Sequence, residues 1–206
     1  SNNNSVRAVC GDICKPLISF WKILKTSPDT VIKEYSKRWS HLQKRGHTYY
    51  YKVREEFNKS DNLHDFLFLS RTCVNGLIRF NKKGEFNNSF HHTRKGISPQ
   101  KLEKIVFDWS AKIQNVTFIA QDYKKITKRL KKGDFVYLDP PYFNTKGRYY
   151  GRINYEEFLI FLETLNKKHI KYAFSFDGKR ELKDYTVKIP NKLYRRHIFI
   201  KSGISL

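Results

Sequence analysis

The sequence predicts an α/β protein whose strand and helix pattern is interrupted by a helical and β-hairpin insert. Apolar runs of strand length alternate with helical patterns at residues 1–25 and again at 105–206. Residues 26–104 are instead basic, rich in Tyr, Asn and His, and lack this alternation. Because strands that alternate with helices form parallel sheets, we expect one core from the two outer segments and a separate insert between them.

The first expected strand ends in an acid just before a helix. Residues 6–11 (VRAVCG) lead into Asp12, and an apolar helical pattern follows from Pro16 to Leu24. In Rossmann-type folds an acid at this position holds ribose hydroxyls, so Asp12 is a candidate binding residue. The alternative is that Asp12 caps the helix, with Pro16 in its first turn.

The insert contains helical patterns and a hairpin signal. Helices are expected at 30–45, 49–58 and 63–71. Residues 77–81 and 85–89 flank a Lys-Lys-Gly turn at 82–84, which predicts a β-hairpin over 77–90. A basic hairpin can lie in a DNA groove. The run 91–96 (HHTRKG) follows, and a solvated loop is its simplest interpretation.

The α/β alternation resumes after the insert. The expected elements are a helix at 99–113, a strand at 116–119 followed by Asp122-Tyr123, a helix at 124–131, a strand at 134–138, a helix at 155–167 and a strand at 171–176. Polar residues therefore follow two of the strands at their carboxyl ends, where open α/β sheets bind ligands.

The strand at 134–138 runs without a break into Asp139-Pro140-Pro141-Tyr142. Neither proline has an N–H for a ladder, so the chain leaves the sheet in a stiff loop. A carboxylate, the Pro140 carbonyl and an aromatic face then point at a common volume. This set suits an exocyclic amine on a planar base, on which Tyr142 would stack for about 1–3 kcal/mol. A strand-ending acid and a Pro-Pro turn of purely structural origin are the alternative.

Charge and composition indicate a polyanionic partner. The 206 residues include 41 Lys and Arg against 19 Asp and Glu, a net charge of +22. Aromatic residues make up 16% and are mixed with the basic ones, as expected where bases are stacked and phosphates are neutralised. No apolar run approaches the roughly 18 residues of a membrane span, and no amphipathic segment suggests binding at a membrane surface.

The cysteines indicate a reducing compartment. Cys10, Cys14 and Cys73 are an odd number, and no signal peptide is recognisable, so we expect reduced thiols in a cytoplasmic setting. A zinc site from these thiols and a histidine is disfavoured because their spacing matches no structural zinc pattern. We therefore expect no metal.

Four stretches of the chain together suggest a family. They are 11–13 with 16–18 (GDI and PLI), 54–60 (REEFNKS), 75–81 with 84–87 (NGLIRFN and GEFN), and 139–142 (DPPY). In these stretches the chain resembles the Dam-type DNA adenine N6-methyltransferases of the α group, over nearly its whole length. The resemblance implies a Rossmann-like, S-adenosylmethionine-dependent core at 1–25 and 105–206, incomplete at its N-terminus, and a target-recognition insert at 26–104.

The resemblance also implies roles for single residues. The residues around S-adenosylmethionine would be Asp12 and Ile13 at the ribose, Asp122 and Tyr123 at the adenine, and Asp139. The catalytic loop around the target adenine would be Asp139, Pro140, Pro141 and Tyr142. The target base must be flipped out, because its amine cannot reach a methyl donor inside a duplex. Contacts to double-stranded DNA would come from Asn75, Leu77, Arg79, Asn81, Lys82, Lys83, His91, His92, Arg94 and Lys95.

The chain departs from the family in two places. Family enzymes carry a Gly-rich loop after their first strand and a basic stretch before it, and this chain begins downstream of both. We expect an upstream segment to be missing, because the strand at 6–11 has the pattern of an inner strand. Familiar Dam enzymes, which recognise GATC, have a Gly-Arg-Tyr-Lys-like run after the hairpin, whereas this chain has His91-His92-Thr93-Arg94. Recognition of a short DNA site other than GATC is therefore an alternative.

The carboxyl end carries less information. Residues 198–205 resemble the closing strand of the family and the loop after it. The basic cluster at 194–197 is interpreted either as a phosphate contact or as a solvated turn.

These expectations define a site-specific enzyme that methylates adenine N6 in double-stranded DNA, as the modification partner of a restriction system. It would be cytoplasmic, of bacterial or phage type, and nucleoid-associated; a monomer on DNA is compatible with the sequence. The alternative is a DNA-binding protein that keeps the fold without catalysis. An RNA-binding or RNA-methylating protein would explain the charge but not the Dam-like hairpin.

Overall fold

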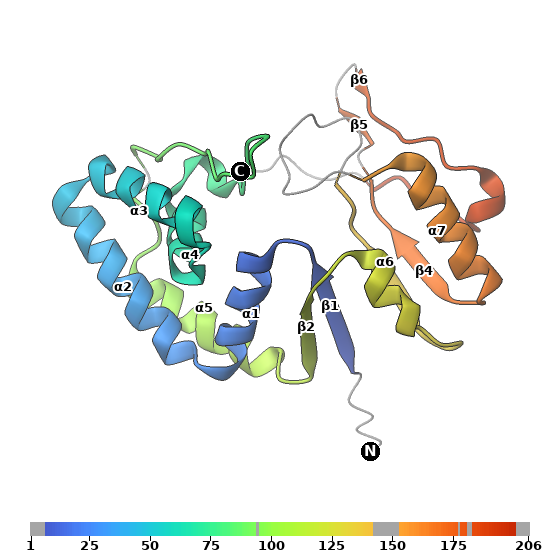
Figure 1. Ribbon diagram of the computed structural model, residues 1–206, viewed down its shortest axis with the longest axis horizontal. Coiled ribbons are helices and arrows are strands. Elements are labelled where there is room, and N and C mark those ends of the chain that lie inside the picture. The colour runs from blue at the N-terminus through green and yellow to red at the C-terminus, as the bar shows by residue number, and fades with distance from the viewer. Residues whose placement is uncertain (1–6, 94, 142–152, 177, 181–182, 201–206) are drawn as a thin grey trace. The chain divides into compact units, whose positions relative to one another are not determined.

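The computed structural model describes residues 7–93, 95–141, 153–176, 178–180 and 183–200 (Figure 1). These residues fall into two compact units, one that ends at Ile126 and one that starts at Thr127. In the described ranges no helix is both long enough and apolar enough to cross a membrane.

The first unit combines a pair of parallel strands with a group of helices. Its elements are β1 (Ala8–Asp12), α1 (Lys15–Thr26), α2 (Pro28–Arg45), α3 (His47–Ser60), α4 (Leu63–Thr72), the 3₁₀ turn η1 (Val74–Gly76), α5 (Pro99–Lys112), β2 (Val116–Ala120) and α6 (Tyr123–Ile126). β1 and β2 pair in parallel, with Asp12 opposite Ala120. Apart from α6, these strands and helices therefore lie where the sequence pattern places them, within a few residues.

Local signals explain where these helices begin and end. Prolines occupy the first turns of α1, α2 and α5, where a missing N–H costs nothing. The side chain of Asn62 caps α4 by accepting hydrogen bonds from the His64 and Asp65 backbone N–H groups. Gly46 ends α2 with a positive φ of 63°, a conformation that glycine adopts without steric cost.

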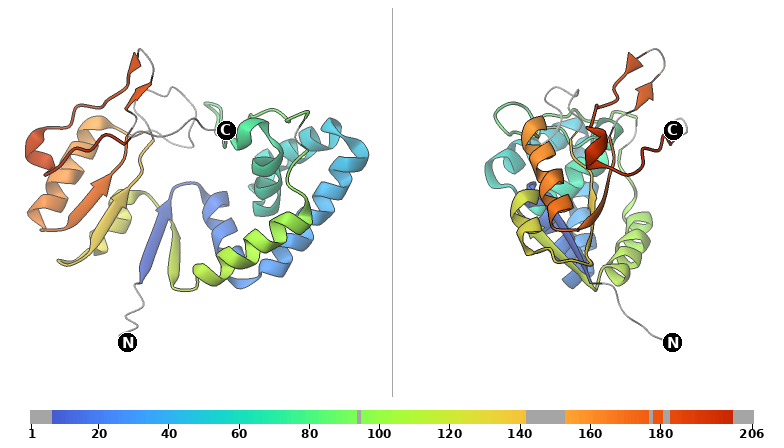
Figure 2. Two further views of the ribbon diagram at one scale, coloured as in Figure 1. Left: turned by 180° about the vertical axis from the view of Figure 1, so that it is seen from behind. Right: turned by 90° about the vertical axis from the view of Figure 1, so that its right-hand side faces the viewer.

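The core of the first unit is unusually aromatic. It lies among α1 to α5, and Figure 2 shows α5 running along α2. Its largest fully buried side chains include Tyr35, Tyr50, Phe57, Phe66 and Phe68. Burial raises the pKa of both tyrosines, and the Tyr35 hydroxyl is satisfied by donating to the Ile97 carbonyl at 2.8 Å.

The expected hairpin at 77–90 is present as a turn without regular strands. Two isolated antiparallel bridges, Cys73 with Phe90 and Phe80 with Phe86, stand where a continuous ladder was expected. The turn itself is closed by the Asn81 N–H, which donates to the Glu85 carbonyl at 2.8 Å. Aromatic side chains from both arms, Phe80 and Phe86, are buried in the core. The Asn87 N–H also donates to the Arg79 carbonyl at 3.0 Å. The loop is thus held by a few backbone bonds and by side-chain burial rather than by a regular ladder.

The second unit is smaller. Its elements are η2 (Thr127–Arg129), β3 (Phe135–Leu138), α7 (Tyr155–Lys167), β4 (Lys171–Phe174), β5 (Lys179–Arg180), β6 (Lys183–Asp184) and η3 (Asn191–Leu193). β3 and β4 pair in parallel, and α7 packs on β4 with Phe158, Phe161, Leu162 and Leu165 buried. Their spacing of three and four residues is that of one helix face.

In the described part of the chain, β1–β2 and β3–β4 are separate two-stranded sheets, and β5–β6 is a third. Parallel strands joined through helices are compatible with an α/β methyltransferase fold. A single Rossmann-like sheet, and the division into core and insert, stay predictions.

Two further expected elements differ in the structure. The helix expected at 124–131 is only α6, which gives way to the 3₁₀ turn η2 at Thr127. Lysine and arginine at 124, 125, 128 and 129 put like charges three and four residues apart, which destabilises a helix. Residues 198–200 form no strand, and Ile200 is 86% exposed, because no described strand pairs with them. Residues 201–206 lie outside the described residues.

Candidate functional site

Asp139 stands at the carboxyl end of β3, as the sequence predicts. Leu138 is buried, Asp139 is exposed and the two prolines that follow are half-buried. The carboxylate Oδ1 accepts a hydrogen bond from the Ser175 hydroxyl at 2.9 Å. Tyr142, the fourth residue of the predicted loop, lies outside the described residues. The site therefore offers a held carboxylate beside a stiff proline turn.

Ser175 was not identified from the sequence. It follows β4, and its N–H donates to the Leu138 carbonyl at 3.1 Å, one step beyond the paired strands. The Tyr137 hydroxyl in turn lies 3.0 Å from Ser175 Oγ. The sequence predicts a strand over 171–176 that includes Ser175, whereas β4 ends at Phe174. The available signal was a polar residue near the carboxyl end of an expected strand, since parallel strands present their carboxyl ends at one edge.

The predicted cofactor residues of the first unit share one edge of the β1–β2 sheet. Asp12 ends β1, and Asp122 and Tyr123 follow β2 after one intervening residue. Asp12 Oδ1 accepts from the Cys14 N–H at 2.7 Å, and Asp122 Oδ1 accepts from the Lys124 N–H at 2.8 Å. Each acid therefore uses one carboxylate oxygen to support the start of a helix. Its second oxygen can still accept a hydrogen bond from a ligand.

The two readings of Asp12 are both compatible with this geometry. The N-cap of α1 is Cys14, which makes no side-chain capping bond, so Asp12 supports the helix start from two residues upstream. Asp12 and Ile13 are exposed and accessible to a ligand. Burial raises the pKa of the Cys14 thiol to about 11, which makes it a protonated core group rather than a nucleophile.

The loop after α4, residues 73–98, carries most of the predicted DNA contacts. Asn75 adopts a left-handed conformation with φ of 55°, and Leu77 is 54% exposed although apolar. The other exposed members are Arg79, Lys82, Lys83, His92 and Lys95. His91 is half-buried, and Arg94 lies outside the described residues.

The Asn81 side chain is bonded within the turn and is not free to contact DNA as predicted. Its Oδ1 accepts from the backbone N–H groups of Lys83 at 2.9 Å and Glu85 at 3.0 Å. Its Nδ2 donates to Glu85 Oε2 at 2.8 Å. The side chain thus builds the turn that carries Lys82 and Lys83.

A row of side chains on α3 anchors this loop. This anchoring role was not predicted from the sequence. Tyr50, Arg54 and Asn58 are four residues apart and share one helix face. Tyr50 and Arg54 both donate to the Asn88 carbonyl, at 3.0 and 3.2 Å. Asn58 makes two bonds to Phe86, donating to its carbonyl at 3.1 Å and accepting from its N–H at 2.7 Å. The conspicuous stretch 54–60 therefore positions the loop.

Asn88 completes the anchor from within the loop. Its buried Nδ2 donates to the carbonyls of Val74 and Leu77, both at 2.9 Å. These bonds draw the 74–77 segment against the far arm of the loop. The exposed residues Asn75 and Leu77 are therefore carried on a backbone that is tied down on both sides.

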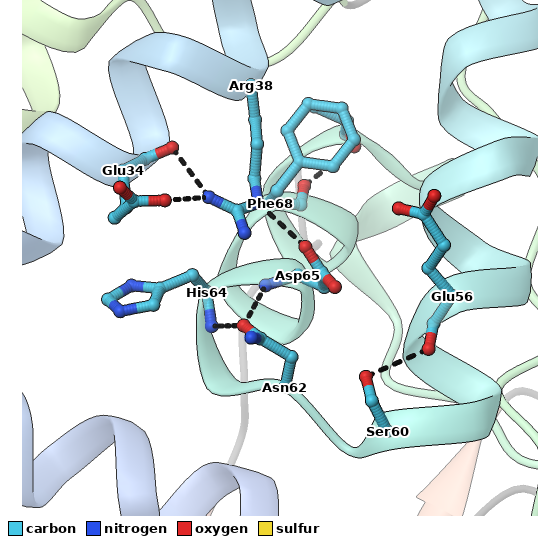
Figure 3. A network of polar contacts seen from close by, with 9 residues as sticks. Glu34, Arg38, Glu56, Ser60, Asn62, His64, Asp65 and Phe68 are labelled. Atoms are coloured by element: carbon cyan, nitrogen blue, oxygen red, sulfur yellow. Dashed lines mark hydrogen bonds and ion pairs between the residues drawn. The ribbon is translucent and has the colours of Figure 1, made fainter.

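A polar network joins α2 to α4 away from the loop (Figure 3). Arg38 donates to Asp65 Oδ1 at 2.7 Å and to Glu34 Oε2 at 2.6 Å. The hydrogen bond from Arg38 lowers the pKa of Glu34 below its usual range. A cavity of about 270 Å³ beside it is lined by charges of both signs from α2, α3 and α4. Because Arg38 is already paired, we interpret this network as a structural link.

The described ranges contain no group of three or more His, Cys, Asp or Glu side chains that could hold a metal ion. The three cysteines are free thiols, Cys10 exposed and Cys14 and Cys73 buried.

Comparison with known proteins shows the family of the chain. The model of the D12 class N6 adenine-specific DNA methyltransferases matches residues 2–198, nearly the whole chain. The chain belongs to this family.

Named relatives cover part of the chain. A DNA adenine methylase from Vibrio cholerae is 35% identical over 145 residues, which are 68% of this chain and 51% of the relative. A DNA adenine methylase from Escherichia coli K12 is 33% identical over 145 residues, with the same coverage. The type II methyltransferase M.MjaIII from Methanocaldococcus jannaschii is 33% identical over 149 residues, 66% of this chain and 50% of the relative. The chain therefore spans about half the length of these relatives.

Proposed function

We propose that the protein transfers a methyl group from S-adenosylmethionine to N6 of a flipped adenine in double-stranded DNA. The observation that carries this proposal is Asp139 at the carboxyl end of β3, held by Ser175 beside the proline turn, in a chain of the D12 class. We further propose a Rossmann-like core and a role as the modification partner of a restriction system.

The proposed chemistry needs acceptors more than a strong base. The lone pair of adenine N6 is delocalised into the ring, and acceptors on its two hydrogens localise that pair for bonding. Asp139 and the Pro140 carbonyl would be these acceptors, and Tyr142 would stack on the base. When bound, S-adenosylmethionine supplies a methyl group whose S–C bond breaks, the electron pair staying on sulfur, as the N6–C bond forms and one N6 proton leaves to solvent. Positioning then provides most of the acceleration.

The residues at the edge of the β1–β2 sheet fit the cofactor's polar groups. Asp12 and Asp122 are acceptors at neighbouring strand ends, which suits ribose hydroxyls and an adenine amine respectively. Ile13 and Tyr123 would add apolar contacts to the same ligand.

Replacing Asp12 by alanine is expected to weaken S-adenosylmethionine binding by about 1.5–3 kcal/mol, the range for hydrogen bonds to a charged group. Titration calorimetry on the protein would measure this. The matched control is Asp29→Ala, which removes an exposed acid from the first turn of α2 and should leave affinity unchanged. If Asp12→Ala instead lowers only the melting temperature, Asp12 is a helix-start residue. A parent protein that binds DNA but no S-adenosylmethionine would favour the non-catalytic alternative.

DNA would be read by the anchored loop and held by charge. A chain of net charge +22 will bind any duplex to some extent, so specificity must come from particular side chains. Lys82 and Lys83 at the turn are flexible point charges suited to phosphate. Arg79, exposed on the arm of the loop, can present a planar fork to a guanine edge, and Arg94 would do the same.

This distinction tests whether the loop after α4 recognises the DNA sequence. Lys82→Ala should weaken binding to all duplexes alike and reduce the salt slope by about one unit, because one phosphate contact is lost. Arg79→Ala and Arg94→Ala should cost about 1–3 kcal/mol on the cognate site and relax its discrimination. Methylation mapped across a random-sequence library measures both effects. If the arginine variants keep the parent's site preference, the loop does not recognise the DNA sequence.

A further inference from the structure

Three side chains form a directed chain of hydrogen bonds at the edge of the β3–β4 sheet. Tyr137 Oη lies 3.0 Å from Ser175 Oγ, which lies 2.9 Å from Asp139 Oδ1. A carboxylate can only accept, so the one proton of the Ser175 hydroxyl is directed at Asp139. The Ser175 oxygen must then accept from Tyr137. The phenol thus sets the direction of the serine, and the serine holds the carboxylate.

The strand pairing explains why these groups meet. Tyr137 and Asp139 are two residues apart, so they project from the same face of the strand and its extension. Leu138 pairs with Phe174 in the parallel register, and the Ser175 N–H continues that register by donating to the Leu138 carbonyl. Ser175 is therefore held by the backbone within reach of both side chains.

We propose that Ser175, supported by Tyr137, is a positioning residue for Asp139; this rests on the proposed methyl transfer. Asp139 is exposed, so close packing does not fix its carboxylate. The bond from Ser175 restrains Oδ1. Oδ2 accepts no hydrogen bond from the described residues and stays available for the target amine. Restraint matters because a misplacement of about 1 Å can cost about a hundredfold in rate.

Steady-state methylation kinetics on the complete protein test this role. Ser175→Ala is expected to lower kcat about tenfold to a hundredfold, with KM for DNA changed less than about threefold, because ground-state binding does not need the restraint. Ser175→Thr retains the hydroxyl and should recover most of the rate. Tyr137→Phe should give a smaller loss than Ser175→Ala. Thr164→Ala, which removes a hydroxyl that bonds only to the Ile160 carbonyl within α7, is the matched control and should behave as the parent.

The outcomes separate this proposal from the proposed function. If Asp139→Ala abolishes methylation while Ser175→Ala keeps the parent kcat, the positioning role is wrong and the function stands. If Asp139→Ala is itself fully active, the role of Asp139 and with it the positioning role of Ser175 are wrong, whereas a complete parent protein without methyl transfer would overturn the proposed function. If Ser175→Ala does not fold, Tyr137→Phe and Ser175→Thr decide: parent-like kcat in Tyr137→Phe together with no activity in a folded Ser175→Thr would overturn the proposal.

Discussion

Asp139→Ala is expected to abolish methylation while DNA affinity stays within about tenfold, roughly 1.4 kcal/mol. The physical reason is that the carboxylate accepts from the target amine chiefly as the transition state forms, so little ground-state binding depends on it. Radiolabelled methyl transfer and duplex binding on the same preparation measure the two quantities. Full activity in this variant would falsify the assignment of the catalytic loop.

Two further variants make this test specific. Asp134→Ala removes another exposed acid next to β3, whose Oδ2 accepts from the Lys131 N–H, and should keep the parent rate. Tyr142→Phe keeps the stacking face and should be far milder than Tyr142→Ala, because the ring contributes more than the hydroxyl. Equal losses in both Tyr142 variants would argue against stacking.

Arg38→Met is expected to destabilise the first unit by about 3–5 kcal/mol, the second large effect. Arg38 and Asp65 have side chains only 14% and 9% exposed, and removing the cation leaves a buried carboxylate without its partner. The three tryptophans, Trp21, Trp39 and Trp109, all lie in the first unit, so their fluorescence in urea reports its unfolding separately.

Controls distinguish the ion pair from a general loss of charge. The double variant Arg38→Met with Asp65→Leu should recover much of the stability, because an apolar pair can replace a buried ion pair. Lys52→Ala breaks the exposed pair with Glu56 on α3, in the same unit, and should leave the midpoint unchanged. An Arg38→Met midpoint equal to the parent's would show that the network carries no stability.

The same network predicts a pH dependence. Arg38 lowers the pKa of Glu34 in the folded state, so the folded protein holds fewer protons there than the unfolded chain. The contribution of Glu34 is therefore present above its ordinary pKa and is lost as pH falls through the lowered value. The stability difference between the parent and Arg38→Met should shrink in acid.

What the sequence predicts, and what only the tertiary structure decides, depends on the range over which the stabilising forces act. Local signals were sufficient for α7, expected at 155–167 and found there, because Asn154 caps its first turn and its apolar spacing is helical. They were also sufficient to place Asp139 at the end of a strand, since Pro140 and Pro141 stop the ladder by their own chemistry. The like charges within 124–131 are a local signal too, and α6 ends at Ile126, short of the expected helix.

The sequence by itself thus determined most of the helices and strands, the acid at the strand end and the family resemblance. Only the tertiary structure showed that Ser175 meets Asp139 across 36 positions of the chain, and that Asn58 meets Phe86 across 28. It also decided that the loop after α4 is held by isolated bridges and side-chain contacts instead of a regular ladder. Helix propensity and capping act over a few residues, whereas these contacts exist only once strand register and helix packing have brought distant segments together.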